Sequence, residues 1–140
     1  MSDFIRACGK GDLSIVEKYV TSGGDINTTS IVGSTGLMRS LMWKQWPISE
    51  YLLDLTTIDT SIKNDFGNNA LHWACRCGAS TDIVSKIVSK TDKQTINYKN
   101  QGGETPIMEA VREGNTALVS LLSQVKMIDW DKEELVRVAR

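Results

Sequence analysis

The sequence has no excess of charge of one sign, because 16 Lys and Arg stand against 17 Asp and Glu among 140 residues. No cluster of basic residues occurs either. A general nucleic-acid binder concentrates Lys and Arg to meet phosphates, so this composition argues against nucleic acid as the main partner. The chain also lacks the roughly 18 to 20 consecutive apolar residues that cross a bilayer. We therefore expect no membrane partner.

The start of the chain lacks the marks of a secretory signal, which are a basic segment, an apolar run and a small-residue cleavage site. Cysteines are few and odd in number, namely Cys8, Cys75 and Cys77. The last two are too close in sequence to suggest a disulfide framework, so reduced thiols in an intracellular compartment fit best. The sequence predicts a cytoplasmic location, with the nucleus as the alternative.

Metal ligands are scarce. His72, the single histidine, forms a His-x-x-Cys-x-Cys cluster with Cys75 and Cys77. Structural zinc needs four convergent ligands, and no fourth is in view. Cys77 lies two residues after Cys75, so the two thiols point about 200° apart around a helix. We expect no metal site.

The elements of nucleophilic catalysis are missing too. One imidazole is available as a base, and the sequence contains neither a Gly-x-Ser-x-Gly elbow nor a phosphate-cradling glycine loop. Glu109 and Glu113 have i,i+4 spacing and could share one helix face, where we expect a solvated edge instead of a catalytic pair. The sequence predicts no enzyme and no cofactor.

Internal repetition is the strongest feature that the sequence does have. Four stretches share one apolar helical pattern, and their leading residues recur at intervals of 33, 35 and 35 positions. The leading residues are Ile15, Ile48, Ile83 and Leu118. A shorter pattern precedes each stretch, in which an apolar residue is followed three positions later by a small one. The apolar residues of this second pattern are Phe4, Leu37, Leu71 and Ile107, and the small residues are Ala7, Ser40, Ala74 and Ala110.

A turn separates the two patterns in each unit. Glycine occupies it at Gly11, Gly78 and Gly114, and Lys44 takes the place in the second unit. Glycine there allows a positive φ and ends the first helix. Each unit therefore reads as helix, turn, helix and polar link. Because helices of about ten residues are marginal alone, we expect the units to stack on one another.

The motifs around these helices are specific. The third unit reads Asp65-Phe-Gly-Asn-Asn-Ala-Leu-His-Trp-Ala74, and the fourth reads Gly103-Glu-Thr-Pro-Ile-Met-Glu-Ala110. Links carry Asp25-Ile-Asn27 in the first unit and a similar motif in the third. These features resemble ankyrin repeats, whose inner helix opens with Thr-Pro-Leu-His-x-Ala. The resemblance covers nearly all of the chain and implies an all-α ankyrin-repeat solenoid of stacked helix-turn-helix units with short β-hairpin linkers.

We expect a single ankyrin-repeat domain over residues 1–140, with units at about 1–29, 30–63, 64–99 and 100–130. The third unit has a longer link through Thr91 to Gln94, which we expect to be a surface loop. Residues 131–140 read as one further helix, which is either a C-terminal cap or the start of a fifth repeat.

The resemblance implies a non-catalytic, monomeric module that binds a protein or peptide through the concave face of its inner helices and its hairpin tips. It also implies a structural role for His72, as a hydrogen-bond partner of neighbouring loop backbone. Aromatic and apolar residues gather in units two and three, and together they would form a contiguous patch with a polar rim. The expected partner-binding residues are Ile31, Val32, Arg39, Met42, Trp43, Asp65, Phe66, Asn68, Trp73 and Arg76.

Two alternatives remain open at the level of sequence. Trp43, Phe66 or Trp73 could stack on a nucleotide or a short single-stranded nucleic acid, with Arg39, Lys63 or Arg76 meeting phosphate. The chain could also be a structural fragment of a longer repeat protein.

Overall fold

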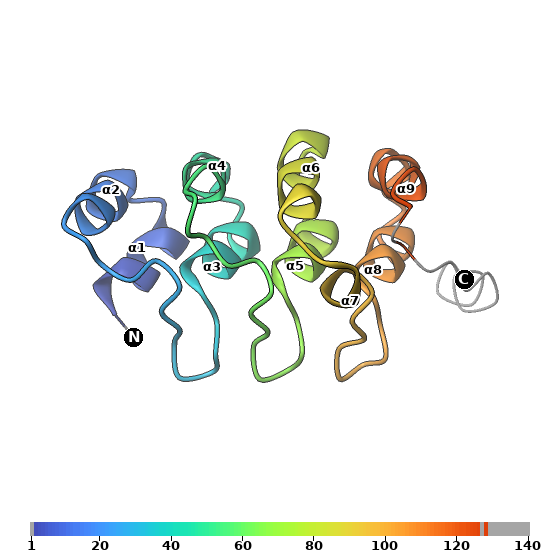
Figure 1. Cartoon of the computed structure of the whole chain (residues 1–140), viewed down its shortest axis with the longest axis horizontal. Helices are drawn as coiled ribbons and strands as arrows, with labels where there is room; N and C mark the ends of the chain where they lie inside the picture. Colours follow the sequence, from blue (N-terminus) through green and yellow to red (C-terminus); the bar gives the residue numbers. More distant parts are fainter. Residues whose placement is uncertain (1, 127, 129–140) are drawn as a thin grey trace.

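The computed structural model describes residues 2–126 and 128, and it shows helix pairs stacked side by side along one axis (Figure 1). The inner layer contains α1 (Asp3–Lys10), α3 (Gly36–Met42), α5 (Ala70–Cys77) and α8 (Pro106–Arg112). The outer layer contains α2 (Leu13–Thr21), α4 (Trp46–Leu53), α6 (Thr81–Ser89) and α9 (Thr116–Ser123). These residues form no β-strand, only an isolated bridge between Thr29 and Thr35. The predicted all-α stack is confirmed.

Polar caps fix where each inner helix begins. The side chain before each helix accepts a hydrogen bond from a backbone N–H three residues further on. The four cap residues are Ser2, Thr35, Asn69 and Thr105. Such caps satisfy N–H groups that a helix start leaves unpaired and contribute about 1 kcal/mol each. The caps lie at matching places in the repeat, so the repeated sequence produces repeated helix starts.

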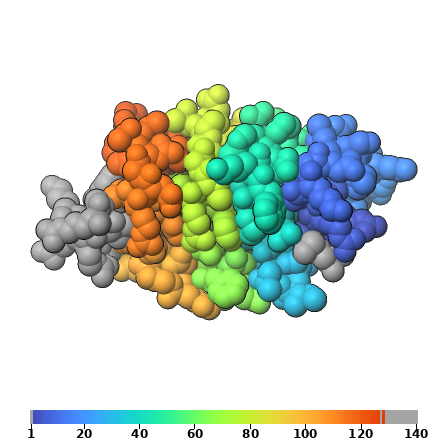
Figure 2. Space-filling view, turned by 180° about the vertical axis from the view of Figure 1, so that it is seen from behind, coloured from blue at the N-terminus to red at the C-terminus, as the bar shows by residue number. Residues whose placement is uncertain are grey.

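The core lies between neighbouring helix pairs. The apolar residues that lead the inner helices are all buried, and so are the small residues three positions later. α1 packs against α3, α3 against α5 and α5 against α8, while the outer helices pack in the same order. Ser40 Oγ lies 2.8 Å from Ser49 Oγ of the outer helix in its own pair. The close approach of α1 and α3 falls at Gly36, where a β-carbon would lie 2.8 Å from Cys8 Sγ. Figure 2 shows the result as parallel slabs that follow one another in chain order.

The links between helix pairs project as fingers along one edge of the stack, on the side of the inner layer (Figure 1). Each tip is a tight turn in which a glycine N–H donates to the carbonyl oxygen three residues earlier. The three glycines are Gly33, Gly67 and Gly103, and each has a positive φ. Each described link folds back through a tight turn as expected, but without the β-strands of the predicted β-hairpins.

Neighbouring fingers are bonded to each other at their tips. The Asp65 N–H donates to the Val32 carbonyl oxygen at 3.0 Å, and the Gln101 N–H donates to the Phe66 carbonyl oxygen at 3.0 Å. A β-carbon at Gly67 would lie 3.1 Å from the Cα of the next finger's Asn100. The fingers are therefore one continuous edge and not three separate loops.

The long link of the third unit differs from the expectation. Instead of a surface loop it contains the helical turn α7 (Lys93–Ile96), and Thr91 is buried. The Asp92 carboxylate accepts a hydrogen bond from the Thr95 N–H at 2.8 Å and so caps this turn. Ile96 is buried in the core. The extra residues form a turn because a capping Asp and a core-filling Ile lie four residues apart.

The turn inside each helix pair keeps one conformation in all four pairs. Gly11, Gly78 and Gly114 have φ values of 86°, 75° and 68°. Lys44 has φ 60° and is the one non-glycine residue with a positive φ among residues 2–126 and 128. A β-carbon in this region costs roughly 1 to 2 kcal/mol. Lys44 thus adopts the same turn as the three glycines, and its β-carbon makes the backbone there sterically strained.

We expect Lys44→Gly to raise the free energy of unfolding by about 0.5 to 1 kcal/mol, because glycine adopts this φ without the steric cost of a β-carbon. Gly78→Lys is the reciprocal control, since it places the same side chain in an equivalent turn with open space around it. It should lower stability by a similar amount. Urea denaturation followed by circular dichroism measures both. Lower stability in Lys44→Gly would contradict the strain assigned to this turn.

The predicted unit boundaries stay a prediction, and the helix predicted over 131–140 lies outside the described residues. Among the helices that the structure describes, none combines the length and apolar character needed to cross a membrane.

Candidate protein-binding face

Three positions recur on each inner helix, and their side chains range from exposed Trp43 to buried Glu109. They lie two, five and six residues after the leading apolar residue, and this i, i+3, i+4 spacing places them on one side of the helix. We call these twelve residues the inner-helix face. They are Arg6, Gly9, Lys10, Arg39, Met42, Trp43, Trp73, Arg76, Cys77, Glu109, Arg112 and Glu113.

Large apolar side chains are exposed at two places. At the tips of the first two fingers, Ile31 is 93% exposed, Phe66 is 56% exposed and Val32 is also exposed. With Asp65 these residues form what we call the finger edge. At the far end of α3, Trp43 is 58% exposed. Helix α3 has seven residues, so its two ends lie about 10 Å apart.

That the expected partner-binding residues form one contiguous patch stays a prediction. Met42 and Trp73 belong to this set and are both partly buried. The Trp73 ring packs against the core, and its Nε1–H is buried without a hydrogen-bond partner. The large exposed apolar side chains are therefore those of the finger edge and Trp43, with Met42 and Trp73 less accessible.

Trp43 lies over the first inner helix. A β-carbon at Gly9 would come within 3.3 Å of Trp43 Cδ1 and 3.6 Å of Arg39 Nε. Glycine at this position therefore leaves the space into which Trp43 and Arg39 fit. Arg39 and Trp43 are spaced i,i+4 on α3, so they lie next to each other on its surface.

An ion pair joins the inner helices α5 and α8. Arg76 donates from Nη2 to Glu109 Oε1 at 2.6 Å and from Nε to Oε2 at 3.2 Å, and its guanidinium lies 4.7 Å from the centre of the Trp73 ring. Glu109 is 3% exposed. The hydrogen bond between Arg76 and Glu109 raises the pKa of the Arg76 guanidinium. We call Trp73, Arg76 and Glu109 the Arg76 cluster.

The Arg76 cluster corrects two expectations. Glu109 is a buried ion-pair partner and not a solvated edge residue, because it faces Arg76 of the preceding unit. Asn68 was expected in the polar rim, yet it is buried and its Oδ1 accepts a hydrogen bond from Asn100 Nδ2 at 2.8 Å. Both polar groups therefore serve contacts within the stack.

His72 holds two units together. The Asn69 N–H donates to its Nδ1 at 3.2 Å, so Nε2 carries the proton and donates to the Glu104 carbonyl oxygen at 2.9 Å. Burial lowers the pKa of His72, which keeps the imidazole neutral as this pairing requires. The structural role implied for this histidine is confirmed.

The cysteines have the environment of packing residues. Burial raises the pKa of Cys8 to about 12 and also raises the pKa of Cys75. Cys77 is partly exposed, and burial raises the pKa of its thiol as well. Across residues 2–126 and 128, no group of three or more His, Cys, Asp or Glu side chains could hold a metal ion.

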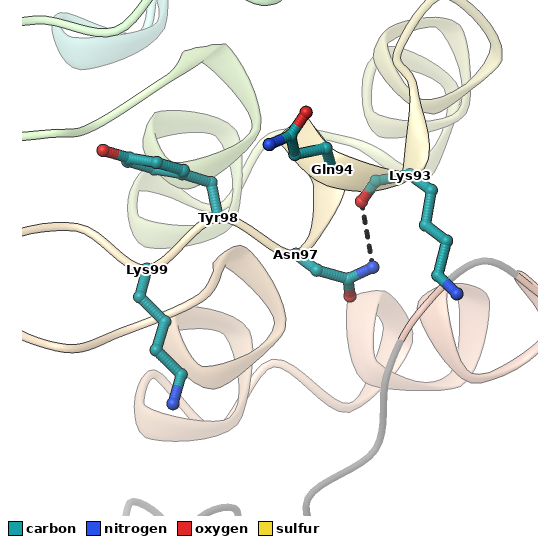
Figure 3. Close-up of a pocket in the computed structure, with 5 residues that line it drawn as sticks. All are labelled: Lys93, Gln94, Asn97, Tyr98 and Lys99. Carbon is teal, nitrogen blue, oxygen red and sulfur yellow. Dashed lines mark hydrogen bonds between the residues drawn. The ribbon is translucent and has the colours of Figure 1, made fainter.

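A hollow of about 520 Å³ lies beside the link after α6. Its lining comprises Lys93, Gln94, Asn97, Tyr98 and Lys99 (Figure 3). The Asn97 amide donates to the Lys93 carbonyl oxygen at 2.9 Å, and the Tyr98 ring turns away from the Lys99 amino group. Lys63 lies 3.8 Å from the centre of the Tyr98 ring. The hollow is open and lined by one short segment, so it does not bring distant chemical groups together.

The sequence did not single out Gln101, which completes the row of fingertips. Its side-chain amide donates to the Asp65 carbonyl oxygen at 2.7 Å, in addition to the backbone bond to the second finger. The repeat pattern could have indicated Gln101, because this residue lies at the same place in its unit as Asp65.

Stacked helix pairs, fingers joined tip to tip and a histidine bonded to the next finger all repeat with the sequence period. A family model described as ankyrin repeats in three copies matches residues 4–100. The chain belongs to the ankyrin repeat family. Ankyrin repeats are a protein-protein interaction module, so the finger edge and Trp43 lie on a fold built for contact with proteins.

Relatives carry these repeats within longer chains. Phosphocholine transferase AnkX of Legionella pneumophila is 27% identical over 124 residues, which are 87% of this chain and 13% of that protein. Probable 26S proteasome regulatory subunit p28 of Saccharomyces cerevisiae is 25% identical over 130 residues, or 91% of this chain and 56% of that protein. Ankyrin repeat and SAM domain-containing protein 6 of Mus musculus is 30% identical over 107 residues, or 76% and 12%. The chain thus spans between about an eighth and just over half of these relatives.

The Arg76 cluster yields a stability prediction. We expect Arg76→Leu to lower the free energy of unfolding by about 1 to 3 kcal/mol, because it leaves the buried Glu109 carboxylate without its cation. Glu109→Leu should cost less, since Arg76 is one-third exposed and can reach water. Urea denaturation of both single variants and of the double variant forms a complete cycle.

The double variant should be more stable than Arg76→Leu alone, because it removes the unpaired carboxylate. Equal costs for the two single variants, or a double variant as unstable as the sum of both, would contradict this account of the pair.

Proposed function

We propose that this ankyrin repeat chain is a non-catalytic scaffold module that binds a protein or an extended peptide across its finger edge and inner-helix face. The observation that supports it most is the exposure of Trp43, which follows the last residue of the inner helix α3, and of Ile31 and Phe66 at the fingertips. Aromatic side chains surrounded by polar groups are typical anchors of interfaces. Exposed apolar surface is unfavourable in water, and a partner that covers these side chains removes this cost.

The proposed mechanism is binding to a preorganised surface. The fingers are bonded through Asp65 and Gln101, and Arg76 is fixed by Glu109. A partner therefore orders mainly side chains when it binds, which keeps the entropic cost of association low. The rest of the interface excludes water around a few anchors, and these anchors carry most of the affinity.

We also propose that the polar contacts come from Asp65 and Arg39, which flank the exposed apolar side chains. Asp65 is exposed at the finger edge, and Arg39 is partly exposed one turn before Trp43. Val32 and Met42 extend the apolar surface. Arg76 and Trp73 contribute through the parts of their side chains that remain accessible.

The wider role follows the same reasoning. We propose that the chain has no catalytic centre, uses no cofactor, and acts as a monomer in the cytoplasm or nucleus. One relative is named as a regulatory subunit of a proteasome, and a corresponding role here would be that of a non-catalytic part of a larger assembly.

The test is affinity capture from a cell lysate with three baits. We expect the wild type and Ile15→Ala to capture the same protein, and the double variant Trp43→Ala/Phe66→Ala to lose it. Ile15 is a matched control because it is 45% exposed but lies on the outer helix α2. Calorimetry with the captured protein should show that each single Trp43→Ala or Phe66→Ala change weakens binding by about 1 to 4 kcal/mol.

Unchanged helical circular dichroism must accompany the loss, so that unfolding does not explain it. Capture that survives in the double variant but fails in Ile15→Ala would place the interface on the outer layer and refute the proposed face.

A further inference from the structure

Arg39 differs from the other arginines of the inner-helix face. Arg6 is paired with Asp3, Arg76 with Glu109 and Arg112 with Glu104. No carboxylate or other acceptor among the described residues pairs with Arg39, and its Nε–H is buried without a hydrogen-bond partner. The Arg39 side chain is nevertheless partly exposed, and a guanidinium is a favourable hydrogen-bond partner for a carboxylate.

The surroundings of Arg39 combine this cation with an apolar surface. Trp43 lies one turn further along α3 and is more than half exposed. Both side chains lie over Gly9, where the missing side chain leaves the space that they fill. A ligand that covers Trp43 therefore also comes within reach of the Arg39 guanidinium.

A second unpartnered donor occupies the same register position in the next unit. Trp73 Nε1–H is buried without an acceptor, as Arg39 Nε–H is. Helices α3 and α5 pack against each other, and packed helices lie about 8 to 10 Å apart. This spacing suits an extended segment that crosses from one helix to the next, although the buried Trp73 N–H itself is not within its reach.

The charges on the inner-helix face are unequal along the stack. In the first two units, Lys10 and Lys44 accompany Arg39, and none of the three has an ion pair among the described residues. In the last two units, the arginines are compensated by buried or partly buried glutamates, and Glu113 adds a negative charge. The first half of the face is therefore basic and complementary to an acidic ligand.

We propose that the first half of the inner-helix face binds an acidic, extended segment of a protein partner. A carboxylate of the partner pairs with the Arg39 guanidinium, and an adjacent apolar side chain covers Trp43. This inference rests on the proposed function and specifies the partner's chemistry.

The test is selection from a displayed library of random peptides with four baits, namely the wild type, Arg39→Gln, Arg6→Gln and Trp43→Ala. Arg6 is the matched control, since it occupies the same register position in the preceding unit but is paired with Asp3. We expect Asp and Glu next to apolar residues to be enriched by the wild type and by Arg6→Gln, and not by Arg39→Gln. A synthetic copy of the leading peptide should bind Arg39→Gln about 10- to 100-fold more weakly than the wild type.

Charge exchange provides a second arm that does not depend on loss of binding. Arg39→Glu should reject the acidic peptide and accept the same peptide with its critical Asp or Glu replaced by Lys. Binding of the original pair should weaken between about 0.1 and 0.5 M salt, because salt screens such pairs. Thermal unfolding of each variant checks that the stack is intact.

The outcomes separate this inference from the proposed function. Peptides that depend on Trp43 but show no acidic preference, or equal acidic enrichment by Arg39→Gln, would overturn the inference and leave the binding face in place. Failure to select any peptide that depends on Trp43 would overturn both. An oligothymidine that binds the wild type more tightly than any peptide and fails to bind Arg39→Gln would show that the Arg39 guanidinium binds phosphate. That result would overturn the proposal of an acidic protein partner.

Discussion

The structure depends on one constraint, which is that no helix pair is long enough to be stable without a neighbour. The eight stacked helices have seven to nine residues each, well below the length at which isolated helices persist in water. Leu37 and Leu71 are fully buried only because adjacent units cover them, and Gly36 lets α3 approach α1, since a β-carbon there would lie 2.8 Å from Cys8 Sγ. Stability therefore arises between units, and the side chains that point away from these contacts are available for a partner.

The same contacts make the exposed surface rigid. Hydrogen bonds between fingertips, the His72 bond to the next finger and the pairing of Arg76 with Glu109 all connect adjacent units. Polar groups that look functional in the sequence are used for this purpose. What remains unsatisfied is a short list, with the exposed ring of Trp43 and the guanidinium of Arg39 beside each other.

The architecture could be predicted because it depends on a pattern of apolar and small residues that repeats about every 33 to 36 positions. Leading apolar residues, small residues and the placement of His72 follow directly from register. The burial of Glu109 could not be predicted, because it depends on which residue of the preceding unit faces it. The helical turn in the link through Thr91 was also missed, because it depends on three-dimensional packing. Periodicity thus fixes the scaffold, while the division of polar residues between stack and surface needs coordinates.

Native-state hydrogen exchange of the 140-residue chain tests the dependence on neighbours most directly. Helices α3 and α5 have a stacked unit on both sides, whereas α1 and α2 have one on a single side. The account predicts that amides of α3 and α5 exchange most slowly and that those of α1 and α2 open at lower free energy. Equal protection of α1 and α5, or faster exchange in α5, would show that the pairs do not depend on their neighbours for stability and would contradict the account.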